Sequence, residues 1–340
     1  MPDFHDTLAR LYLPLLCNSQ SEVRRQAYAL LVSTYGPQAL PALRELLNDP
    51  DARTRTQVRQ SLHAIAALDA DAAPPRERHM QISCLGGLRV ALGERVIQPH
   101  DWMQRDAGRA GWRKVQGVFA YLADRGWRGA SRAELGAAVW GGDVSPTSLS
   151  RTLTALRQML LDASDAQFVA RALVVTREQV LLLPECYHSD VQVFEHIFQL
   201  ACVTESEHDL AAAVPLYSRA VQLYAGPYLA DVALDWEWLE RRRDHYTTSF
   251  LIAAERLAEH AFGERRYHQC IAICRRALDA DETAEEIHVW LLRAYARLHQ
   301  YSDLTHTYRR YVQVSTLARQ DGDAEHDQVV RTYHELTARC

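Results

Sequence analysis

The chain has 340 residues, of which 48% are hydrophobic, and this length is enough for two or three domains with substantial cores. Its 38 basic and 43 acidic residues give a formal net charge of −5, so a nucleic-acid interface would have to be a local surface. No apolar run reaches the length of a membrane span and the N-terminus lacks the features of a signal peptide, so we expect a cytoplasmic protein without membrane contact.

Residues 1–68 carry four groups of apolar residues at helical spacing, separated by breaks at 18–21, 36–37 and 48–50. Within them, SEVRRQAYALL and LLNDPDARTRTQVRQSLHAI resemble HEAT-type repeats. Two such repeats cannot bury both of their faces, so we expect this module to dock on the rest of the protein or on an unknown partner or ligand. A helical cap without a partner is the open alternative. Residues 69–79 lack periodicity and are interpreted as a linker.

A short stretch with strand-like alternation follows the linker. Residues 82–97 alternate apolar and polar side chains around Gly86-Gly87 and Gly93-Glu94, which predicts a small antiparallel sheet. Residues 112–124 then place Val115, Val118, Phe119 and Leu122 on one face of a helix that ends at Gly126.

Two short helices joined by a sharp turn are predicted next, between residues 131 and 160. Ser131 and Glu134 form a capping box at the start of the first helix. Ser145 and Pro146 mark the start of the second, and Gly141-Gly142 permit the turn between them. We interpret this segment as a helix-turn-helix.

The second of these helices is amphipathic. An apolar stripe is formed by Leu149, Leu153, Leu156 and Leu160. The opposite face has hydroxyls and guanidiniums without a carboxylate, which suits contact with phosphates and base edges: Thr147, Ser148, Ser150, Arg151, Thr154 and Arg157. An ordinary solvated helix surface is the alternative interpretation.

The segment FVARALVVTREQVLLL follows, and we interpret it as two β-rich runs joined by a polar tip at Arg177, Glu178 and Gln179. The order of strands, helix, helix-turn-helix and β-hairpin resembles a winged helix of the OmpR/PhoB type. RKVQGVFAYLA is similar to the first helix of that family, Val139-Trp140-Gly141 to its turn, and Leu156-Arg157 to the end of its recognition helix. We assign residues 80–189 to this domain.

Residues 190–340 return to helical periodicity, in paired segments that suggest tetratricopeptide-like (TPR-like) packing. Several motifs here resemble the bacterial transcriptional activation domain that follows the winged helix in the Streptomyces antibiotic regulatory protein (SARP) family. They are Asp190 with Phe194-Glu195, Tyr224-Ala225-Gly226 with Leu229, Trp236, and Asp281 with Glu285 and His288. The resemblance covers about residues 80 to 320. Thus we predict a mainly α protein with a small β component, in which HEAT-like and TPR-like helical repeats flank a winged helix-turn-helix domain.

The C-terminal part departs from the family pattern. Where the family usually has Gly after the penultimate helix and Ala in the last, this chain has His299-Gln300 and Thr305. QDGDAEHDQ replaces the usual Gly-x-x-Pro at the start of the final helix.

The sequence contains no motif for catalysis. Lys114 is the one lysine of the chain, so a phosphate-binding GxxxxGK[ST] loop is absent, and neither HExxH nor GxSxG occurs. Cys270 and Cys274 lie four residues apart but have no second ligand pair, so we expect buried thiols rather than a metal site. We expect His288 to be a packing residue, and we predict neither an enzyme nor a cofactor.

The resemblance to the winged-helix family implies roles for individual residues. It places Ser150, Arg151 and Thr154 toward base edges in the major groove, where a guanidinium can bind guanine through two hydrogen bonds. Phosphate contacts are implied for a second group of residues: Arg132, Trp140, Thr147, Ser148 and Arg157. Arg177 at the tip of the wing could reach the minor groove.

These expectations define a sequence-specific transcriptional regulator, most simply an activator. The SARP resemblance implies binding to promoter DNA at direct repeats, with a possible homodimer, and contact with RNA polymerase or its sigma factor. The alternative is a non-enzymatic helical-repeat scaffold for protein partners, with a winged helix that no longer binds DNA.

Overall fold

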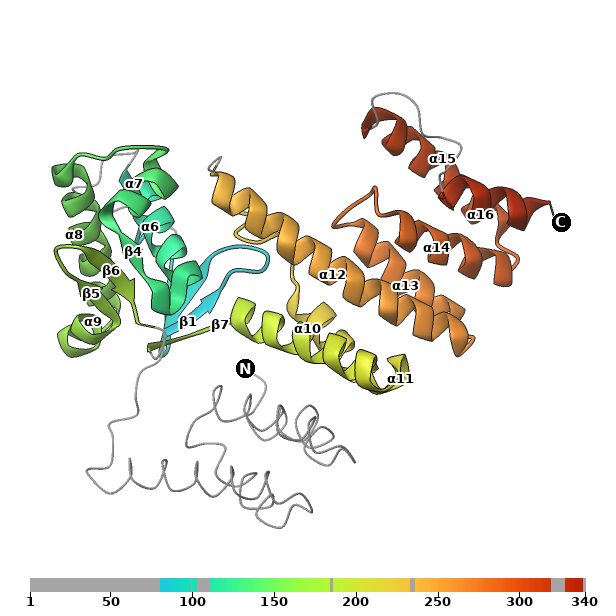
Figure 1. Cartoon of the computed structure of the whole chain (residues 1–340), viewed down its shortest axis with the longest axis horizontal. Coiled ribbons are helices and arrows are strands. Elements are labelled where there is room, and N and C mark those ends of the chain that lie inside the picture. The colour runs from blue at the N-terminus through green and yellow to red at the C-terminus, as the bar shows by residue number, and fades with distance from the viewer. Residues whose placement is uncertain are drawn as a thin grey trace, which may run out of the picture. The chain divides into compact units, whose positions relative to one another are not determined.

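The computed structural model describes residues 80–98, 100–102, 111–183, 186–232, 236–318 and 328–338 (Figure 1). The predicted HEAT-like module and linker at residues 1–79 lie outside these ranges. Residues 78–201 and 209–340 form one compact unit, to which the following description applies. The division of this part of the chain into domains at 80–189 and 190–340 stays a prediction.

The unit begins with a four-stranded sheet made of β1 (Met80–Ser83), β2 (Arg89–Leu92), β3 (Arg95–Ile97) and β7 (Tyr187–Ser189). The strand order is β3-β2-β1-β7; β1 pairs antiparallel with β2 and parallel with β7, and β2 pairs antiparallel with β3. Alternation buries Met80 and Ile82 and exposes Gln81 and Ser83. The predicted antiparallel sheet is confirmed, and β7 adds a strand whose residues lie 107 positions after their partners on β1 (Met80 pairs with Tyr187).

Three helices follow the sheet: α6 (Gly111–Arg125), α7 (Arg132–Trp140) and α8 (Pro146–Ala163). A short 3-10 turn, η4 (Gly126–Arg128), separates α6 from α7. The apolar stripe predicted for α6 is buried. Both predicted caps are present: Ser131 and Glu134 bond reciprocally at the start of α7, and the Ser145 hydroxyl accepts from the Ser148 amide at the start of α8.

The turn between α7 and α8 has the backbone that its glycines suggest. Gly141 has φ of 79°, in the left-handed region where a side chain is disfavoured. Its amide donates to the carbonyl of Ala137, and this closes α7. The predicted pair of short helices joined at a sharp corner is therefore confirmed.

The segment after α8 differs from the prediction in its first half. Residues 166–172 form a helix, α9 (Ala166–Ala172), and only β5 (Leu173–Val175) and β6 (Gln179–Leu182) make the hairpin. The Asp165 carboxylate accepts from the Phe168 amide and caps α9, so Phe168 and Val169 are buried on a helix face instead of alternating along a strand. A third strand, β4 (Ala130–Ser131), pairs with β6 on the other side.

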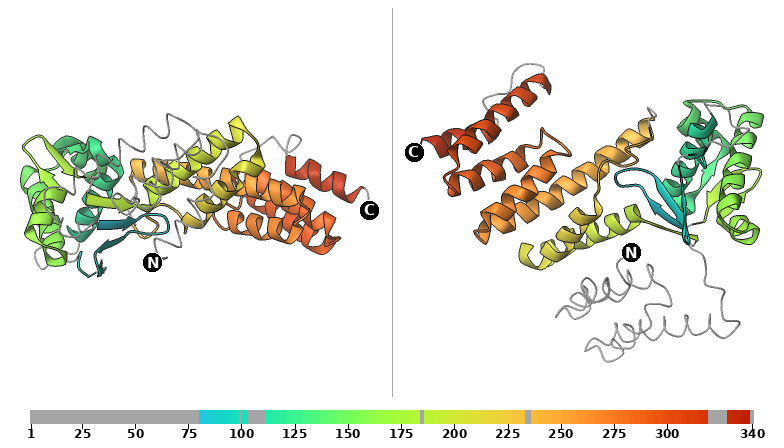
Figure 2. Two further views of the ribbon diagram at one scale, coloured as in Figure 1. Left: turned by 90° about the horizontal axis from the view of Figure 1, so that it is seen from below. Right: turned by 180° about the vertical axis from the view of Figure 1, so that it is seen from behind.

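The rest of the unit is helical, with α10 (Asp190–Glu207), α11 (Leu210–Leu223), α12 (Glu237–Gly263), α13 (Tyr267–Leu278), α14 (Glu285–Arg297), α15 (Tyr301–Ala318) and α16 (Gln328–Thr337). Figures 1 and 2 show α12, α13 and α14 packed side by side. These three helices contain several fully buried small residues, among them Ala253, Ala258, Ala277 and Ala294. Small side chains allow the helix axes to approach closely, as the predicted TPR-like rhythm requires.

The structure describes part of the C-terminal region in which the sequence departs from the family pattern. His299, in the position where the family usually has Gly, adopts φ of 57° in the turn between α14 and α15. α16 forms in spite of the altered segment before it, most of which lies outside the described residues. Cys270 and Cys274 are buried, as expected, and His288 is buried with its Nε2 2.9 Å from the carbonyl oxygen of Glu282.

Candidate nucleic-acid interface

The outer face of α8 presents most of the residues assigned to DNA. Five of them are exposed within the described part of the chain: Thr147, Ser150, Arg151, Thr154 and Arg157. Ser148 is half-buried, because its amide takes part in the N-terminal cap. No carboxylate lies on this helix between Pro146 and Gln158. The exposed face is therefore cationic and rich in hydroxyl groups.

The opposite face of α8 fixes the helix in place. Leu149, Leu156 and Leu160 are at most 1% exposed, and Leu153 is 6% exposed. At the C-terminal end, the guanidinium of Arg95 on β3 donates to the carbonyl oxygen of Asp162. A cation at this end also satisfies the helix dipole, so the N-terminal sheet helps to hold α8 in its orientation.

Two hydroxyls on α8 are already engaged with the helix backbone. Thr154 Oγ1 donates to the carbonyl of Ser150 at 2.9 Å, and the buried Thr152 donates to the carbonyl of Ser148 at 3.0 Å. Thr154 retains acceptor capacity toward a base amino group, whereas the Arg151 side chain forms no hydrogen bond with the residues that the structure describes. Arg151 is consequently the better placed of the two for recognition through donors.

Arg132, at the start of α7, contacts the tip of the β5–β6 hairpin, which is the predicted wing. Its Nε donates to the carbonyl of Arg177 at 3.1 Å, and its Nη2 lies 3.4 Å from the carbonyl of Thr176. Thr176 also closes the hairpin by accepting from the Gln179 amide at 2.9 Å. Arg132 therefore positions the wing tip, which places Arg177 in an exposed position next to the N-terminus of α7.

The C-terminal end of α7 carries Trp140, the remaining residue assigned to phosphate. Its ring is half-buried and lies 5.4 Å from Nζ of Lys114, which also donates to the carbonyl of Val139. Burial lowers the pKa of Lys114. The single lysine is thus part of the support for α7.

Two tryptophans from the C-terminal helical region reach the same end of α7. The indole of Trp236 donates to the carbonyl of Val139 at 3.2 Å, and that of Trp238 donates to the carbonyl of Ala138 at 3.0 Å. These carbonyls belong to the last turn of α7, which has no partners within the helix. Trp236 belongs to the family motif, but the sequence does not indicate its contact with α7. The partner is a backbone carbonyl, and a backbone carbonyl leaves no signal in the sequence.

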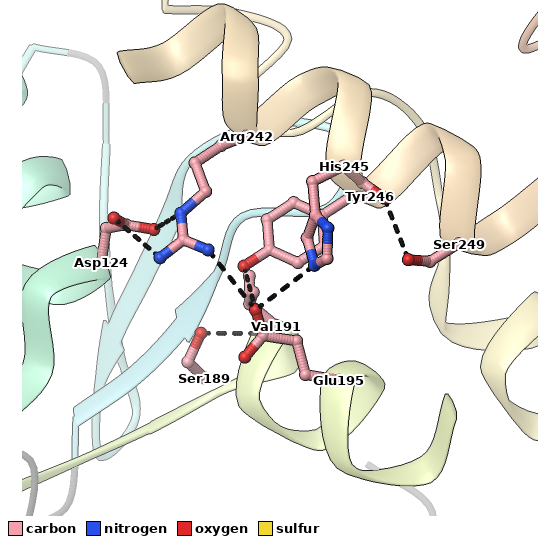
Figure 3. Close-up of polar contacts among 8 residues, drawn as sticks. All are labelled: Asp124, Ser189, Val191, Glu195, Arg242, His245, Tyr246 and Ser249. Atoms are coloured by element: carbon pink, nitrogen blue, oxygen red, sulfur yellow. Dashed lines mark hydrogen bonds and ion pairs between the residues drawn. The ribbon is translucent and has the colours of Figure 1, made fainter. Parts of the chain in front are cut away.

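An ionic network joins α6, α10 and α12 close to this contact (Figure 3). Arg242 Nε lies 2.7 Å from Oδ1 of Asp124, and Arg242 Nη1 lies 3.7 Å from Oε1 of Glu195. The Tyr246 hydroxyl donates to Glu195 at 2.7 Å. Burial raises the pKa of Asp124, and the nearby guanidinium partly offsets that increase. Sequence reasoning identified none of these ion pairs.

Asp190, which the family motif singled out, binds the N-terminal sheet. Its carboxylate accepts from the amides of Cys84 at 2.8 Å and Leu85 at 3.0 Å. Asp231 accepts from the Leu88 amide at 2.8 Å. The two carboxylates thus accept hydrogen bonds from the backbone amides of the turn between β1 and β2. These bonds link the helical region to the sheet.

The described residues contain no cluster of three or more His, Cys, Asp or Glu side chains arranged to hold a metal ion. Among the helices in the described ranges, none has the length and apolar character needed to cross a membrane.

Residues 189–336 match the family model described as the bacterial transcriptional activator domain. The fold is similar to that of Mycobacterium tuberculosis EmbR, solved in complex with a low-affinity phosphopeptide, with a TM-score of 0.56 and 19% sequence identity. The similarity covers 77% of this chain and 65% of the EmbR chain, so this protein spans less than two thirds of the length of the EmbR chain. A comparison with curated proteins gave no match.

We call residues 189–336 the activator domain after this match. This match confirms the predicted resemblance to SARP-type regulators, and the fold shared with EmbR confirms a mainly α protein with few strands. The winged helix and the HEAT-like module stay predictions. The matched domain model points to a regulatory protein.

Proposed function

We propose that this protein is a sequence-specific DNA-binding transcriptional regulator, acting as an activator in the cytoplasm without catalytic activity. The observation that carries the proposal is the exposed, carboxylate-free face of α8, supported by the activator domain at residues 189–336. Such a face can enter the major groove of promoter DNA while the leucine stripe keeps the helix packed.

Each residue has a proposed role in this complex. Arg151 reads a guanine through two hydrogen bonds, with Ser150 and Thr154 beside it. Thr147, Ser148 and Arg157 hold phosphates, together with the Trp140 indole. Arg132 holds a phosphate at the N-terminus of α7, next to the predicted wing, and Arg177 enters the adjacent minor groove. The phosphate contacts orient α8, and the contacts of Arg151 determine the sequence that is bound.

The second part of the proposal concerns the transcription machinery. The helical activator domain would contact RNA polymerase or its sigma factor, and two copies would occupy a direct repeat as a dimer. One recognition helix covers a short site, so two copies would raise both affinity and selectivity.

The test uses the full chain and DNA fragments selected from the genome of the source organism. Binding is measured by fluorescence anisotropy across a salt series, and the proposal requires an affinity that falls linearly in log–log form. Arg151→Ala is expected to weaken binding to the selected DNA site by about 5- to 150-fold, which corresponds to about 1–3 kcal/mol of discrimination between bases. Arg157→Ala is expected to weaken binding to DNA of any sequence. It should also reduce the slope of log affinity against log salt concentration by about 1.

The matched control removes two charges from the same part of the chain. Arg89 and Arg128 are exposed but lie away from α8, on β2 and η4, and Arg89→Ala with Arg128→Ala should leave specific binding unchanged. If Arg151→Ala with Arg157→Ala binds DNA as the wild type does while protein partners are still retained, the protein is a scaffold and the proposal is wrong.

A further inference from the structure

A pocket of about 640 Å³ opens among α12, α14, α15 and α16, within the activator domain and away from α8. Its lining includes Phe262 and Gly263 from the end of α12 and Glu335 and Leu336 from α16. The volume lies within the range that holds small organic molecules in proteins. Neither the family match nor the similarity to EmbR assigns a function to it.

One wall of the pocket is aromatic. The rings of Phe262 and Trp290 lie 5.5 Å apart with an interplanar angle of 55°, and both are half-buried. The Glu255 side chain lies beside the Trp290 indole at this wall. Tyr301 adds a third aromatic ring at the start of α15. This wall offers a flat apolar body a surface for stacking.

Two guanidiniums line the same pocket, one helical turn apart on α14. Arg293 Cζ lies 5.1 Å from the centre of the Trp290 ring, and Arg297 Cζ lies 5.9 Å from the centre of the Phe262 ring. Within the residues that the structure describes, neither guanidinium forms an ion pair. Each group is held over an aromatic face and retains hydrogen-bond donors.

The carboxylates at the pocket do not neutralise these charges. Glu259 is paired with Arg256 at 2.7 Å, on the same helix. Glu335 is exposed on α16, and it forms no ion pair with either guanidinium. Two arginines and one unpaired glutamate leave the pocket with a net positive charge, next to the aromatic wall.

We propose that this pocket binds a small organic anion with a flat aromatic or unsaturated body. Arg293 and Arg297 would hold its carboxylate or sulfonate group through charge-assisted hydrogen bonds, and the body would stack against Phe262 and Trp290. Such a ligand would link α12, α14 and α16, and its binding does not depend on the proposed contact with DNA.

The test compares two fluorescent probes of nearly equal shape on the full chain. One is 1-anilinonaphthalene-8-sulfonate, an aromatic anion, and the other is N-phenyl-1-naphthylamine, which lacks the sulfonate. We expect saturable binding of the sulfonate at one site per chain. Arg293→Gln with Arg297→Gln should weaken binding of the sulfonate by about tenfold or more, because its charge-assisted hydrogen bonds are lost. The same variant should bind the neutral probe within about twofold of the wild type.

Two further variants control the interpretation. Arg266→Gln with Arg309→Gln removes two exposed arginines outside the pocket and should bind both probes as the wild type does. Ala296→Phe fills the pocket, whose lining includes Ala296, while both pocket arginines remain, and it should weaken both probes.

The proposal is overturned if the sulfonate binds the pocket variants as tightly as the wild type. It is also overturned if the arginine variant loses both probes equally, since the charges would then have no selective role. Displacement of the sulfonate by inorganic phosphate at the same concentration would show a simple anion site, and the requirement for a flat body would be wrong.

Discussion

Gly117 on α6 and Trp236 at the start of α12 are in direct contact: a Cβ atom on Gly117 would lie 2.0 Å from Cη2 of the Trp236 ring. No side chain larger than hydrogen can occupy position 117 while the ring stays in place. The contact brings the indole to the carbonyl of Val139, so a glycine of α6 and a tryptophan from the activator domain together support α7.

The first prediction follows from this contact. Gly117→Ala should destabilise the folded chain by about 1–3 kcal/mol through overpacking, although alanine is the better helix former. Urea unfolding measures the loss. Combining it with Trp236→Ala should give less than the sum of the two single losses, because the clash then disappears. Gly142→Ala, where a Cβ would meet nothing within 4 Å, is the control and should change stability by less than about 0.5 kcal/mol.

The second prediction concerns the pH dependence of Asp124. Its pKa in the folded chain is raised by burial, so the folded state holds this proton more tightly and stability falls as pH rises from the ordinary aspartate pKa through the folded one. Arg242→Gln removes the guanidinium that opposes this shift and should raise the pKa of Asp124 further.

The Arg242→Gln variant should therefore lose more stability at neutral pH than at about pH 3, where the carboxyl is mostly protonated in both states. At neutral pH we expect a loss of about 1–3 kcal/mol, between the values of exposed and buried ion pairs. Urea unfolding at several pH values measures it. Adding Asp124→Asn should remove the extra pH dependence; if it persists in that double variant, another group is responsible.

The third prediction compares Ser145, which caps the N-terminus of α8, with Ser150, which lies on the exposed face of α8 and is proposed to contact DNA. Ser145→Ala should cost about 1 kcal/mol of stability, because the Ser148 amide loses its cap. Ser150→Ala is exposed and should leave the unfolding free energy within about 0.5 kcal/mol of the wild type. Under the proposed function, Ser150→Ala should nevertheless alter the preferred DNA sequence, as measured by selection from random oligonucleotides. Equal stability losses in both variants would contradict the assignment of Ser145 as the cap.

The fourth prediction concerns the wing. Arg132→Lys keeps the charge but cannot reproduce two donors directed at the carbonyls of Thr176 and Arg177. Hydrogen exchange at the amides of residues 176–179 should therefore become faster, while exchange in α8 stays unchanged. If Arg132 were only a phosphate ligand, exchange in the wing of the free protein would not respond to the substitution.

Local patterns in the sequence predicted the parts of the fold that depend on near neighbours. The Ser131–Glu134 box, the Ser145–Pro146 start and the leucine stripe of α8 rest on interactions within four residues or on helical periodicity, and all are present as predicted. The same periodic reasoning failed at residues 168–172, because a short apolar run suits either a strand or a helix and the Asp165 cap determined the outcome.

The sequence by itself thus determined α6, α7 and α8, the turn between α7 and α8, and which face of α8 is polar. Only the tertiary structure decided what holds that helix pair. Trp238 and Trp236 bind backbone carbonyls about 100 residues earlier in the chain, and Arg242 meets Asp124 across a similar separation. Every residue has a backbone carbonyl, so the sequence does not show which carbonyl accepts a hydrogen bond. An arginine that forms an ion pair is likewise indistinguishable in the sequence from one that is exposed to solvent. Their partners are therefore set by how the helices pack, which no local pattern records.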